Sequence, residues 1–493
     1  MSENVKTFKM VIDGKWVNSC DNDWINVENP ANKTIFARVP RGKAADVDIA
    51  VAAAKKAFKT WSQTSAPERA KLLHAIANTV EQNVEHLART ISSENGNALR
   101  TQSRGEANLT VDIIRYVAGL AREIKGTTSY LNSQTLDYTR REPFGVVGAI
   151  VPWNAPLMLA ALKIIPAIMT GNTIVMKASE EAPLAVLELA RFCNEHLPPG
   201  VVNLITGSGI ECGAPLVEHK DVPKISFTGS TAVGKSILAA ASSRVAAVTL
   251  ELGGKSAQVV FPDVDLDYTT DGVITAMRFS RQGQSCTAGS RLFVHESIAD
   301  AFLEKLIGKL KKLKVGDPLN EENDAGSLVN AKQFARVKGY IQEAIEAKPN
   351  ALLLGGMPPE TGPLSEGYFV QPTVFLNLPP EVRMTREEVF GPVLSVTTWK
   401  HESDVVERAN DSEYGLAAFI WSRAGGPAIR MAHALDAGWV QINQGGGQQL
   451  GHSYGGFKQS GKGREFSLEG MLDSFTDVKQ ISMNIGDAGF PRL

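Results

Sequence analysis

The sequence predicts an α/β protein in which short parallel strands alternate with helices in more than one domain. Runs rich in β-branched residues alternate with amphipathic helical stretches along most of the 493 residues, and this alternation is typical of βαβ units. A chain of this length is expected to divide into two or three domains. The hydrophobic fraction of 43% and the 44 glycines allow large cores with many tight turns.

Helices are expected first along the chain, and strands follow them. Apolar residues recur at helical spacing over residues 47–61, and a similar amphipathic pattern continues over residues 72–87. Beyond these helices, short β-rich runs alternate with helical ones, which predicts a parallel sheet. The expected strands cover residues 173–177, 201–205, 224–227 and 247–252.

A second alternating series occupies about residues 257–455 and predicts a second α/β domain, with strands at 292–294 and 394–399. The segment 128–148 alternates in character and resembles an extended hairpin that leaves the first domain and returns to it. Residues 474–486 are expected to form a terminal strand. A hairpin and a terminal strand are therefore expected besides the two α/β domains.

The longest apolar stretch, Ala149–Met169, has about the length of a membrane span. Three prolines, Asn154 and Lys163 interrupt it. Prolines remove backbone donors, and an amide and an ammonium would be costly in lipid. We therefore expect a buried strand, a turn and a helix here, whose polar residues need another explanation.

Charge and cysteine usage exclude several classes of partner. The net charge is −2 and no basic block is present, so neither a nucleic acid nor a membrane is an expected partner. The four cysteines show no CxxC spacing and no nearby histidine pair, which predicts no metal site and no disulfide framework. The N-terminal residues lack an apolar signal region, so the cytoplasm is the expected compartment.

A glycine-rich segment at residues 226–236 lies between an expected strand and an expected helix. Residues 229–236 fit the phosphate-loop pattern G-x-x-x-x-G-K-[ST], which favours an NTPase. The same glycines could admit the pyrophosphate of a dinucleotide, although their spacing departs from G-x-G-x-x-G. A plain strand-to-helix turn is the third interpretation. The segment alone does not decide among them.

Cys286 differs from the other cysteines in its surroundings. Small and polar residues flank it within 279–291, leaving room for a substrate. A thiol of this kind is expected to be at least a few per cent thiolate at neutral pH, which makes it a candidate nucleophile. The alternative is a small buried hydrophobic residue, the ordinary role of a free cysteine.

Two further polar side chains stand in apolar surroundings. Glu251 follows a strand-like run directly before two glycines, where burial would raise its pKa toward the range of a general base. Its alternative role is to cap a neighbouring turn. The amide of Asn154 could donate to an oxyanion, or it could satisfy buried backbone.

Several fragments gain meaning when they are taken together. Four of them are ProTrpAsn (152–154), PheThrGlySer (227–230) with Gly234, LeuGluLeuGlyGlyLys (250–255) and GlyGlnSerCysThrAla (283–288). Three more are GluValPheGlyPro (388–392), AsnAspSerGluTyrGlyLeu (410–416) and the segment 455–465. In this order and spacing they resemble the aldehyde dehydrogenase superfamily from about residue 10 to 480. The resemblance implies that the Gly229 turn contacts a dinucleotide and that its NTPase pattern is a coincidence.

The resemblance implies oxidation of an aldehyde to a carboxylic acid through a thiohemiacetal and a thioester on Cys286. Asn154 and the Cys286 backbone N–H would hold the oxyanion. Glu251 would activate the hydrolytic water and deprotonate the thiol. Its presence favours hydrolysis over transfer to coenzyme A. Lys163 and Glu465 match positions near the proton exit.

The implied cofactor is NAD, with NADP as the alternative. Lys177 and Glu180 match the segment that binds the adenosine ribose, and a carboxylate binds a 2′-hydroxyl but repels a 2′-phosphate. The other implied cofactor-binding residues are Trp153, Gly229, Ser230, Gly234, Leu252, Glu388 and Phe390.

The substrate is expected to be a bulky aromatic or terpenoid aldehyde. Several positions that are bulky or aromatic in relatives are small or polar here, and Ser453-Tyr454 replaces Pro-Phe. The expected pocket residues are Ala155, Met158, Leu162, Ser280, Ser285, Thr287, Gln448 and Tyr454.

Three structural units are expected. A Rossmann-like dinucleotide-binding domain would comprise 1–123 and 144–253, and an α/β catalytic domain would comprise 254–460. Segments 124–143 and 474–493 would form a small β oligomerisation element. Since exposed strand edges invite pairing, a homodimer or homotetramer is expected. A nucleotide-binding NTPase and a non-catalytic protein of the same fold are the alternatives.

Overall fold

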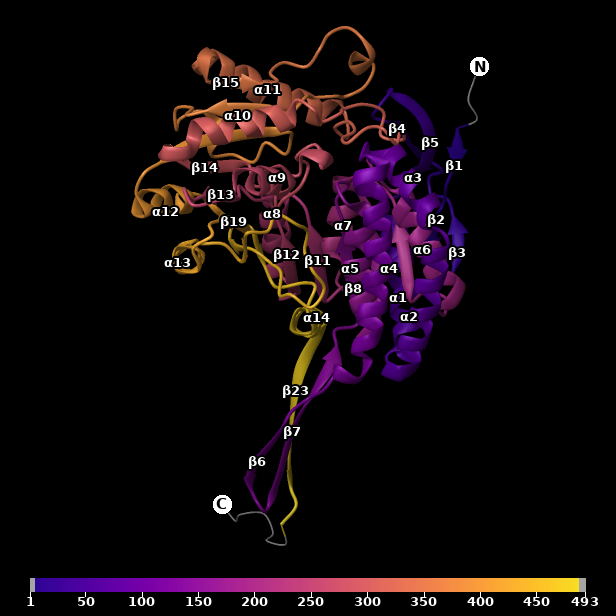
Figure 1. Cartoon of the computed structure of the whole chain (residues 1–493). Helices are drawn as coiled ribbons and strands as arrows, with labels where there is room; N and C mark the ends of the chain where they lie inside the picture. Colours follow the sequence, from indigo (N-terminus) through magenta and orange to yellow (C-terminus); the bar gives the residue numbers. More distant parts are fainter. Residues whose placement is uncertain (1–4, 487–493) are drawn as a thin grey trace.

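The computed structural model describes residues 5–486, which form two large sheets with helices packed on them and a projecting β arm (Figure 1). The predicted α/β fold is confirmed. Residues 1–4 and 487–493, which fall in the predicted first domain and terminal segment, lie outside the described residues.

The first sheet has a parallel centre with antiparallel strands added at both sides. Its five central strands pair in parallel, in register from Val146 opposite Thr173 to Glu251 opposite Thr228. The carboxyl ends of these strands therefore meet along one edge, which is the usual place for a site in such sheets. In spatial order the strands are β22 (Gly461–Lys462), β12 (Ala247–Glu251), β11 (Lys224–Thr228), β8 (Val146–Ile150), β9 (Thr173–Lys177), β10 (Val202–Ile205), β2 (Met10–Ile12) and β3 (Lys15–Val17).

Helices cover both faces of the first sheet, so apolar residues of its central strands are buried on both sides. Successive residues of β9 show this: Ile174 and Met176 pack in one hydrophobic cluster, and Val175 packs in another. The helices of this part are α1 (Ala44–Trp61), α2 (Ala66–Gln82), α3 (Val84–Asn95), α4 (Arg104–Gly119), α5 (Pro156–Met169), α6 (Leu184–His196), α7 (Ala214–Glu218) and α8 (Thr231–Ser242).

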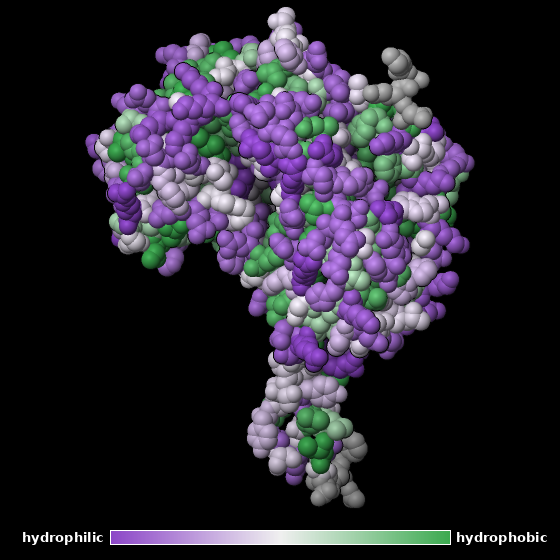
Figure 2. Space-filling view, turned by 45° about the vertical axis from the view of Figure 1, so that its right-hand side comes forward, coloured by the Kyte–Doolittle hydropathy of each residue, from purple (hydrophilic) through white to green (hydrophobic). Residues whose placement is uncertain are grey.

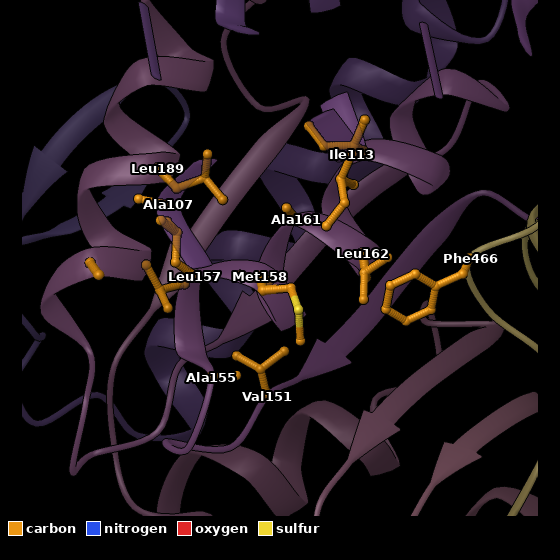
Figure 3. Packing of buried hydrophobic residues seen from close by; sticks show 14 of the residues in the cluster. Ala107, Ile113, Val151, Ala155, Leu157, Met158, Ala161, Leu162, Leu189 and Phe466 are labelled. Carbon is orange, nitrogen blue, oxygen red and sulfur yellow. The ribbon is translucent and has the colours of Figure 1, made fainter. Parts of the chain in front are cut away.

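The apolar stretch around Asn154 forms the end of β8, a turn and the buried helix α5, as predicted. Pro156 stands in the first turn of α5, where no intrahelical donor is needed. Met158 and Leu162 lie along the helix, and Leu162 faces Phe466 (Figure 3). No helix within residues 5–486 has both the length and the apolar character needed to cross a membrane.

The second sheet is parallel except at its edge strand β15. In spatial order its strands are β15 (Leu352–Leu354), β16 (Thr373–Leu376), β17 (Val393–Trp399), β14 (Arg291–His295), β13 (Ala257–Val260), β19 (Ala417–Trp421) and β20 (Trp439–Ile442). Its helices are α9 (Leu266–Ala276), α10 (Ala299–Leu310), α11 (Ala331–Ala347), α12 (Glu402–Asn410) and α13 (Gly425–Ala434).

The projecting arm consists of β6 (Thr128–Asn132), β7 (Thr135–Pro143) and β23 (Thr476–Asn484), paired antiparallel in the order β23-β7-β6 (Figure 1). It unites the predicted hairpin with the predicted terminal strand. Smaller elements are the strands β1 (Lys6–Thr7), β4 (Trp24–Asn29), β5 (Thr34–Pro40), β18 (Tyr414–Gly415) and β21 (Phe457–Lys458), and the helix α14 (Leu468–Phe475).

Two predicted element limits were wrong. The amphipathic pattern over 72–87 spans two helices, because Asn83 leaves the helical conformation with φ −113° and ψ 13° between α2 and α3. Residues 474 and 475 end helix α14, so the terminal strand begins at Thr476. Beyond residue 460 the chain returns to the first sheet as β22, through antiparallel pairing with β12. The predicted domain boundaries stay a prediction.

Candidate active site

A cleft with an open volume of about 1290 Å³ lies where the carboxyl ends of the first sheet meet the second domain. Asn154, Cys286 and seven of the nine predicted cofactor-binding residues line it. These seven are Trp153, Glu180, Gly229, Ser230, Leu252, Glu388 and Phe390. The sequence fragments that are far apart along the chain thus share one cleft.

The remaining two predicted cofactor-binding residues, Lys177 and Gly234, do not line the cleft. The ammonium of Lys177 donates to a carboxylate oxygen of Glu180 at 2.6 Å, so it holds Glu180, which lines the cleft. Gly234 lies in α8 against Leu252, and a Cβ there would come within 2.5 Å of that side chain. Lys177 therefore affects the cleft through Glu180, and Gly234 affects it through Leu252.

Cys286 stands in the loop between a 3₁₀ turn at Phe279–Arg281 and strand β14. Burial raises the pKa of its thiol to about 12, and the carboxylates of Glu388 and Glu251 act in the same direction. The expectation of a few per cent thiolate was therefore wrong for this structure. The reason is tertiary, since residues distant in sequence surround the sulfur. A base is needed to form the thiolate.

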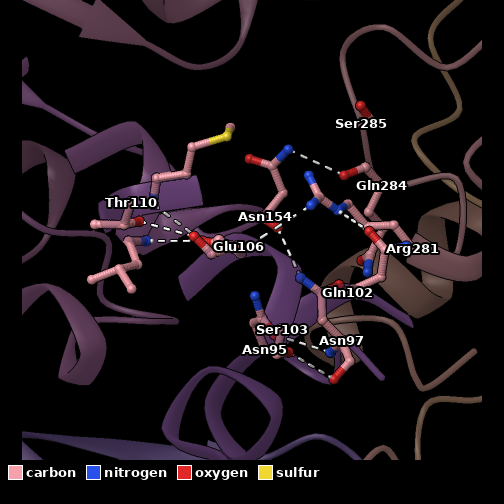
Figure 4. A network of polar contacts seen from close by, with 12 residues as sticks. Asn95, Asn97, Gln102, Ser103, Glu106, Thr110, Asn154, Arg281, Gln284 and Ser285 are labelled. Carbon is pink, nitrogen blue, oxygen red and sulfur yellow. Dashed lines mark hydrogen bonds and ion pairs between the residues drawn. The ribbon is translucent and has the colours of Figure 1, made fainter. Parts of the chain in front are cut away.

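Asn154 is held in the turn between β8 and α5. Its side-chain amide donates to the backbone oxygen of Gln284 at 3.1 Å, two residues before Cys286. Its own backbone oxygen accepts from the side chain of Asn97 at 3.0 Å (Figure 4). One amide N–H thus satisfies buried backbone, which was the alternative role for Asn154. An amide has two N–H donors, so the second is left for an oxyanion.

Glu251 ends strand β12 and is buried, and within residues 5–486 neither of its carboxylate oxygens has a hydrogen-bond partner. Burial raises the pKa of this carboxyl well above its usual value. The Glu465 carboxylate raises it further, whereas Lys163 and Arg464 oppose the shift. A buried carboxyl without a structural partner and with a raised pKa has the properties of a general base. A role as a turn cap is not supported.

Lys163 and Glu465 form a buried ion pair, with the ammonium 2.9 Å from the carboxylate. The ammonium also donates to the Ser226 hydroxyl at 3.2 Å. This pair explains the lysine inside the apolar run of α5, since a buried charge needs a partner. It also places a charged pair close enough to Glu251 to shift its pKa.

Three side chains behind Asn154 were missed by sequence reasoning. The carboxylate of Glu106 in α4 accepts from the backbone N–H of Leu157 and of Met158, at 3.0 and 3.3 Å, and so caps helix α5. Arg281 lies 4.0 Å from the same carboxylate and donates to Gln102 at 3.1 Å (Figure 4). The only available signal was an acidic residue on the apolar face of an amphipathic helix.

The cleft wall opposite the first sheet is built around Glu388. Its carboxylate accepts from the Gly254 N–H at 3.0 Å, and burial raises its pKa to about 7. Phe390 adopts φ 57° and meets Trp153 edge to face, with the ring centroids 5.4 Å apart. The shape of this wall is therefore fixed by a strained backbone and an aromatic contact.

Helix α11 supplies further cleft residues that were not predicted. Gln333 donates to the Phe390 backbone oxygen at 2.8 Å, and Arg336 donates to the Glu388 backbone oxygen at 2.6 Å. Lys332 also lines the cleft. These residues carry no local motif, so only the tertiary structure shows their place.

The cleft fits a dinucleotide because two positions of its wall, Gly229 and Gly253, have no room for a side chain. A Cβ on Gly229 would lie 2.4 Å from the Phe227 ring, and one on Gly253 would lie 2.6 Å from the Glu388 carboxylate. The NTPase alternative is not supported, because the lysine and serine of its phosphate-loop pattern do not reach the cleft. Lys235 and Ser236 are exposed on α8 and do not line it. Within the described residues, no cluster of three metal-ligating side chains is present.

None of the eight predicted substrate-pocket residues lines the large cleft. Ala155, Met158 and Leu162 belong to the hydrophobic core, and Leu162 borders a separate cavity of about 350 Å³ (Figure 3). Ser280 accepts a hydrogen bond from Gln102 at 2.6 Å.

The other predicted pocket residues lie closer to the nucleophile. The hydroxyls of Ser285 and Thr287, which flank Cys286, are 3.1 Å apart. Gln448 hydrogen-bonds Tyr454, whose hydroxyl lies 3.8 Å from the Cys286 sulfur. The side chain of Tyr454 therefore covers part of the Cys286 sulfur and does not open space beside it.

A sequence model of the aldehyde dehydrogenase family matches residues 16–481. The chain belongs to the aldehyde dehydrogenase family. An aldehyde dehydrogenase of Davidiella tassiana is 40% identical over 487 residues, covering 98% of this chain and 96% of that protein. A putative aldehyde dehydrogenase structure from Burkholderia cenocepacia has a TM-score of 0.95 at 39% identity, covering 99% of both chains. PnpE, solved with nicotinamide adenine dinucleotide, has a TM-score of 0.95 at 40% identity, covering 98% of this chain and 99% of its own.

The predicted enzyme class is confirmed: this aldehyde dehydrogenase is an oxidoreductase of class EC 1.2.1 that acts on an aldehyde with a nicotinamide dinucleotide, NAD or NADP. The resemblance seen in the sequence thus extends over nearly the whole chain. The NTPase alternative and the non-catalytic alternative are not favoured.

Proposed function

We propose that this aldehyde dehydrogenase oxidises a bulky aldehyde to the free acid through a thiohemiacetal and a thioester on Cys286, with NAD as the preferred cofactor. The observation that carries the proposal is the convergence of Cys286 and Asn154 in the cleft that Glu180 also lines, with Glu251 close enough to raise the pKa of the thiol. Nucleophile, oxyanion donor and base then lie around one reaction centre.

The first step is attack of the Cys286 sulfur on the aldehyde carbon. The thiol proton passes to the Glu251 carboxylate, whose raised pKa makes it a stronger proton acceptor than an exposed carboxylate. The free amide N–H of Asn154 and the Cys286 backbone N–H stabilise the oxyanion that forms. Each such donor is worth about 2.7–4 kcal/mol in the transition state.

Collapse of the thiohemiacetal releases a hydride and leaves a thioester on Cys286. A nicotinamide dinucleotide in the cleft would accept this hydride. Glu388, Phe390 and Trp153 shape the wall against which it would lie. The edge-to-face contact between Trp153 and Phe390 and the hydrogen bond from Gly254 to the Glu388 carboxylate hold that wall in place, which favours a productive orientation.

Hydrolysis of the thioester completes the turnover. Once the first proton has left Glu251, its carboxylate takes a proton from water as the water attacks the acyl carbon, and the carbon–sulfur bond breaks to return the Cys286 thiolate. The Lys163–Glu465 pair behind Glu251 offers the proton a route away from the site. A glutamate in this position supports release of the free acid rather than transfer to coenzyme A.

The preference for NAD over NADP rests on Glu180. Its carboxylate lines the cleft and is held by Lys177 at 2.6 Å. A fixed carboxylate accepts a hydrogen bond from a ribose 2′-hydroxyl and repels a 2′-phosphate. The pairing with Lys177 reduces that repulsion, so NADP is expected as a weaker alternative cofactor.

The proposed substrate class is an aromatic or terpenoid aldehyde. Ala155, Leu162 and Ser280 are smaller or more polar than the residues that relatives carry at these positions, although Ala155 and Leu162 pack in the hydrophobic core and none of the three lines the large cleft. The rings of Tyr454, Trp439 and Phe466 stack edge to face beside Cys286, which offers an apolar wall to a ring or an isoprenoid chain. Acetaldehyde would leave much of this surface uncovered.

We also propose a homodimer or homotetramer in a reducing cytoplasm. The strands β23 and β6 form the two edges of the projecting arm, and no other strand of residues 5–486 pairs with them. Exposed apolar side chains lie on the arm and near its tip (Figure 2). Unpaired edges with apolar surface favour association. All four cysteines are free thiols, which suits a reducing compartment.

NADH absorbance with a panel of aldehydes tests the proposal. Wild type is expected to give higher kcat/KM with benzaldehyde or a branched ten-carbon aldehyde than with acetaldehyde, and higher kcat/KM with NAD than with NADP. Cys286→Ala is expected to lose turnover. Normal turnover by Cys286→Ala would contradict the mechanism, whereas a preference for acetaldehyde would contradict only the substrate class.

A further inference from the structure

The hydroxyl of Tyr454 lies 3.8 Å from the sulfur of Cys286, within hydrogen-bonding range for sulfur. The Tyr454 ring is 4% exposed and meets Trp439 and Phe466 edge to face, with centroid separations of 5.7 and 5.5 Å. Backbone hydrogen bonds of 3.1 and 2.8 Å join Tyr454 to Glu465 in both directions. Rings and backbone together fix the direction of the hydroxyl.

This hydroxyl keeps its proton and can only donate it to a thiolate. Burial raises the pKa of Tyr454 well above 10, and the neighbouring Cys286 and Glu251 raise it further, although a hydrogen bond from Gln448 opposes the shift. A neutral phenol beside a thiolate is a donor in a charge-assisted hydrogen bond.

The surroundings of the sulfur otherwise disfavour its charged form. Burial, Glu388 and Glu251 raise the thiol pKa, and Arg281 lowers it from a distance. The charge of the Cys286 thiolate also raises the pKa of Arg278. The Arg278 guanidinium, however, donates to the backbone oxygens of Gly445 and Gly446 in the glycine-rich loop and not to the sulfur. Within residues 5–486, Tyr454 is the one side chain that hydrogen-bonds the sulfur.

We propose that Tyr454 is a further catalytic residue, whose hydroxyl donates a hydrogen bond to the Cys286 thiolate and so increases the fraction of enzyme ready to attack the aldehyde. This inference rests on the proposed role of Cys286 as nucleophile. No proton leaves Tyr454, because the thiol proton goes to the Glu251 carboxylate. Once sulfur bonds to the aldehyde carbon its charge is gone, so the hydrogen bond acts on thiolate formation.

Removing the hydroxyl has two opposing effects on the reactivity of sulfur. A charge-assisted hydrogen bond shifts a thiol pKa by about one unit, so Tyr454→Phe should hold about tenfold less thiolate. The more basic thiolate is also more nucleophilic, with a Brønsted coefficient of about 0.4–0.5. The net loss in the rate of attack below the thiol pKa is therefore about threefold.

The test measures alkylation of Cys286 by iodoacetamide between pH 6 and 10. A Cys20→Ser background removes the exposed thiol, and the other two cysteines are buried. Tyr454→Phe should react about threefold more slowly than wild type across this range, all of which lies below the thiol pKa of about 12. Tyr268→Phe, which removes the hydroxyl of an exposed tyrosine that donates to the Asn443 backbone oxygen and not to the sulfur, should match wild type.

Identical alkylation rates for wild type and a folded Tyr454→Phe would overturn the inference. If Tyr454→Phe did not fold, 3-fluorotyrosine labelling keeps the ring and makes the hydroxyl a stronger donor, so Cys286 should react faster with iodoacetamide; an unchanged rate would overturn the inference equally. The proposed function is judged separately, by turnover of Cys286→Ala.

Discussion

At the scale of single residues, the buried carboxylate of Glu251 is one of few buried charges without a hydrogen-bond partner in the described part of the chain, the Lys255 ammonium being another. Most buried charges have partners: Lys163 pairs with Glu465, and Arg291 donates to three backbone oxygens. Glu251 has no hydrogen-bond partner among the described residues. An unsatisfied buried carboxylate costs stability, which a role in proton transfer explains.

Asn154→Ala should lower kcat by about 10²–10³-fold, because one oxyanion donor is lost. The KM for the aldehyde should change much less, since the oxyanion forms only after binding. Steady-state kinetics by NADH absorbance measure both values. A fall in kcat/KM caused by KM alone would show that Asn154 binds the substrate and does not stabilise the transition state.

Glu251→Gln should slow thioester hydrolysis by about 10²–10⁴-fold, the usual contribution of a general base. The base works only when ionised, and burial raises its pKa. Wild-type activity should therefore fall as the pH drops through that raised pKa. This acid limb should disappear in Glu251→Gln. Rapid-quench detection of the acyl-enzyme gives the hydrolysis rate, and an unaltered acid limb would assign it to another group.

At the scale of elements, the start of helix α5 is set by a residue of another helix. The Glu106 carboxylate from α4 accepts the N–H groups of Leu157 and Met158 and places a negative charge at the positive end of the α5 dipole. Asn154 lies just before this helix, so the cap also positions the oxyanion donor. Element packing and catalysis are connected here.

Glu106→Gln should lower the free energy of unfolding by about 1–3 kcal/mol, because a buried charge-assisted acceptor is lost and Arg281 loses its counter-charge. Urea unfolding followed by fluorescence measures this. Asp112→Asn on the exposed face of the same helix is the matched control and should stay within about 0.5 kcal/mol of wild type. Equal stabilities for the two variants would argue against the cap.

At the scale of the whole molecule, the arm is the part least able to be stable alone. Three strands without a core of their own bury little surface, and a sheet of this kind needs a partner on at least one face. Val478 in β23 is 52% exposed and Met483 is 50% exposed. Another copy of the chain would cover them.

Light scattering after size exclusion should give two or four times the chain mass of 53.1 kDa. Val478→Asp should shift the protein toward the single-chain mass, because a charge would have to be buried at the contact. Ile49→Asp on α1 starts from 51% exposure and is the matched control, expected to leave the mass unchanged. A single-chain mass for wild type would contradict an oligomer.

Local patterns were sufficient for the order of elements. The strand predicted at 173–177 coincides with β9, because β-branched runs between turns depend little on distant residues. The break at Asn83 escaped prediction, since polar residues on both sides continue the amphipathic pattern and only the backbone angles reveal it. The motifs also led to Cys286, Glu251 and Asn154, because each of them lies close in sequence to glycine, serine or proline residues that form a recognisable pattern.

The sequence by itself determined the α/β fold, the family resemblance and the candidate nucleophile, because these are written in short contiguous fragments. The tertiary structure decided what surrounds each fragment. It showed that burial raises the pKa of Cys286, that Lys163 pairs with Glu465 across 302 positions, and that Tyr454 contacts the sulfur. Electrostatics and packing act through space, and such contacts leave no local pattern in the chain.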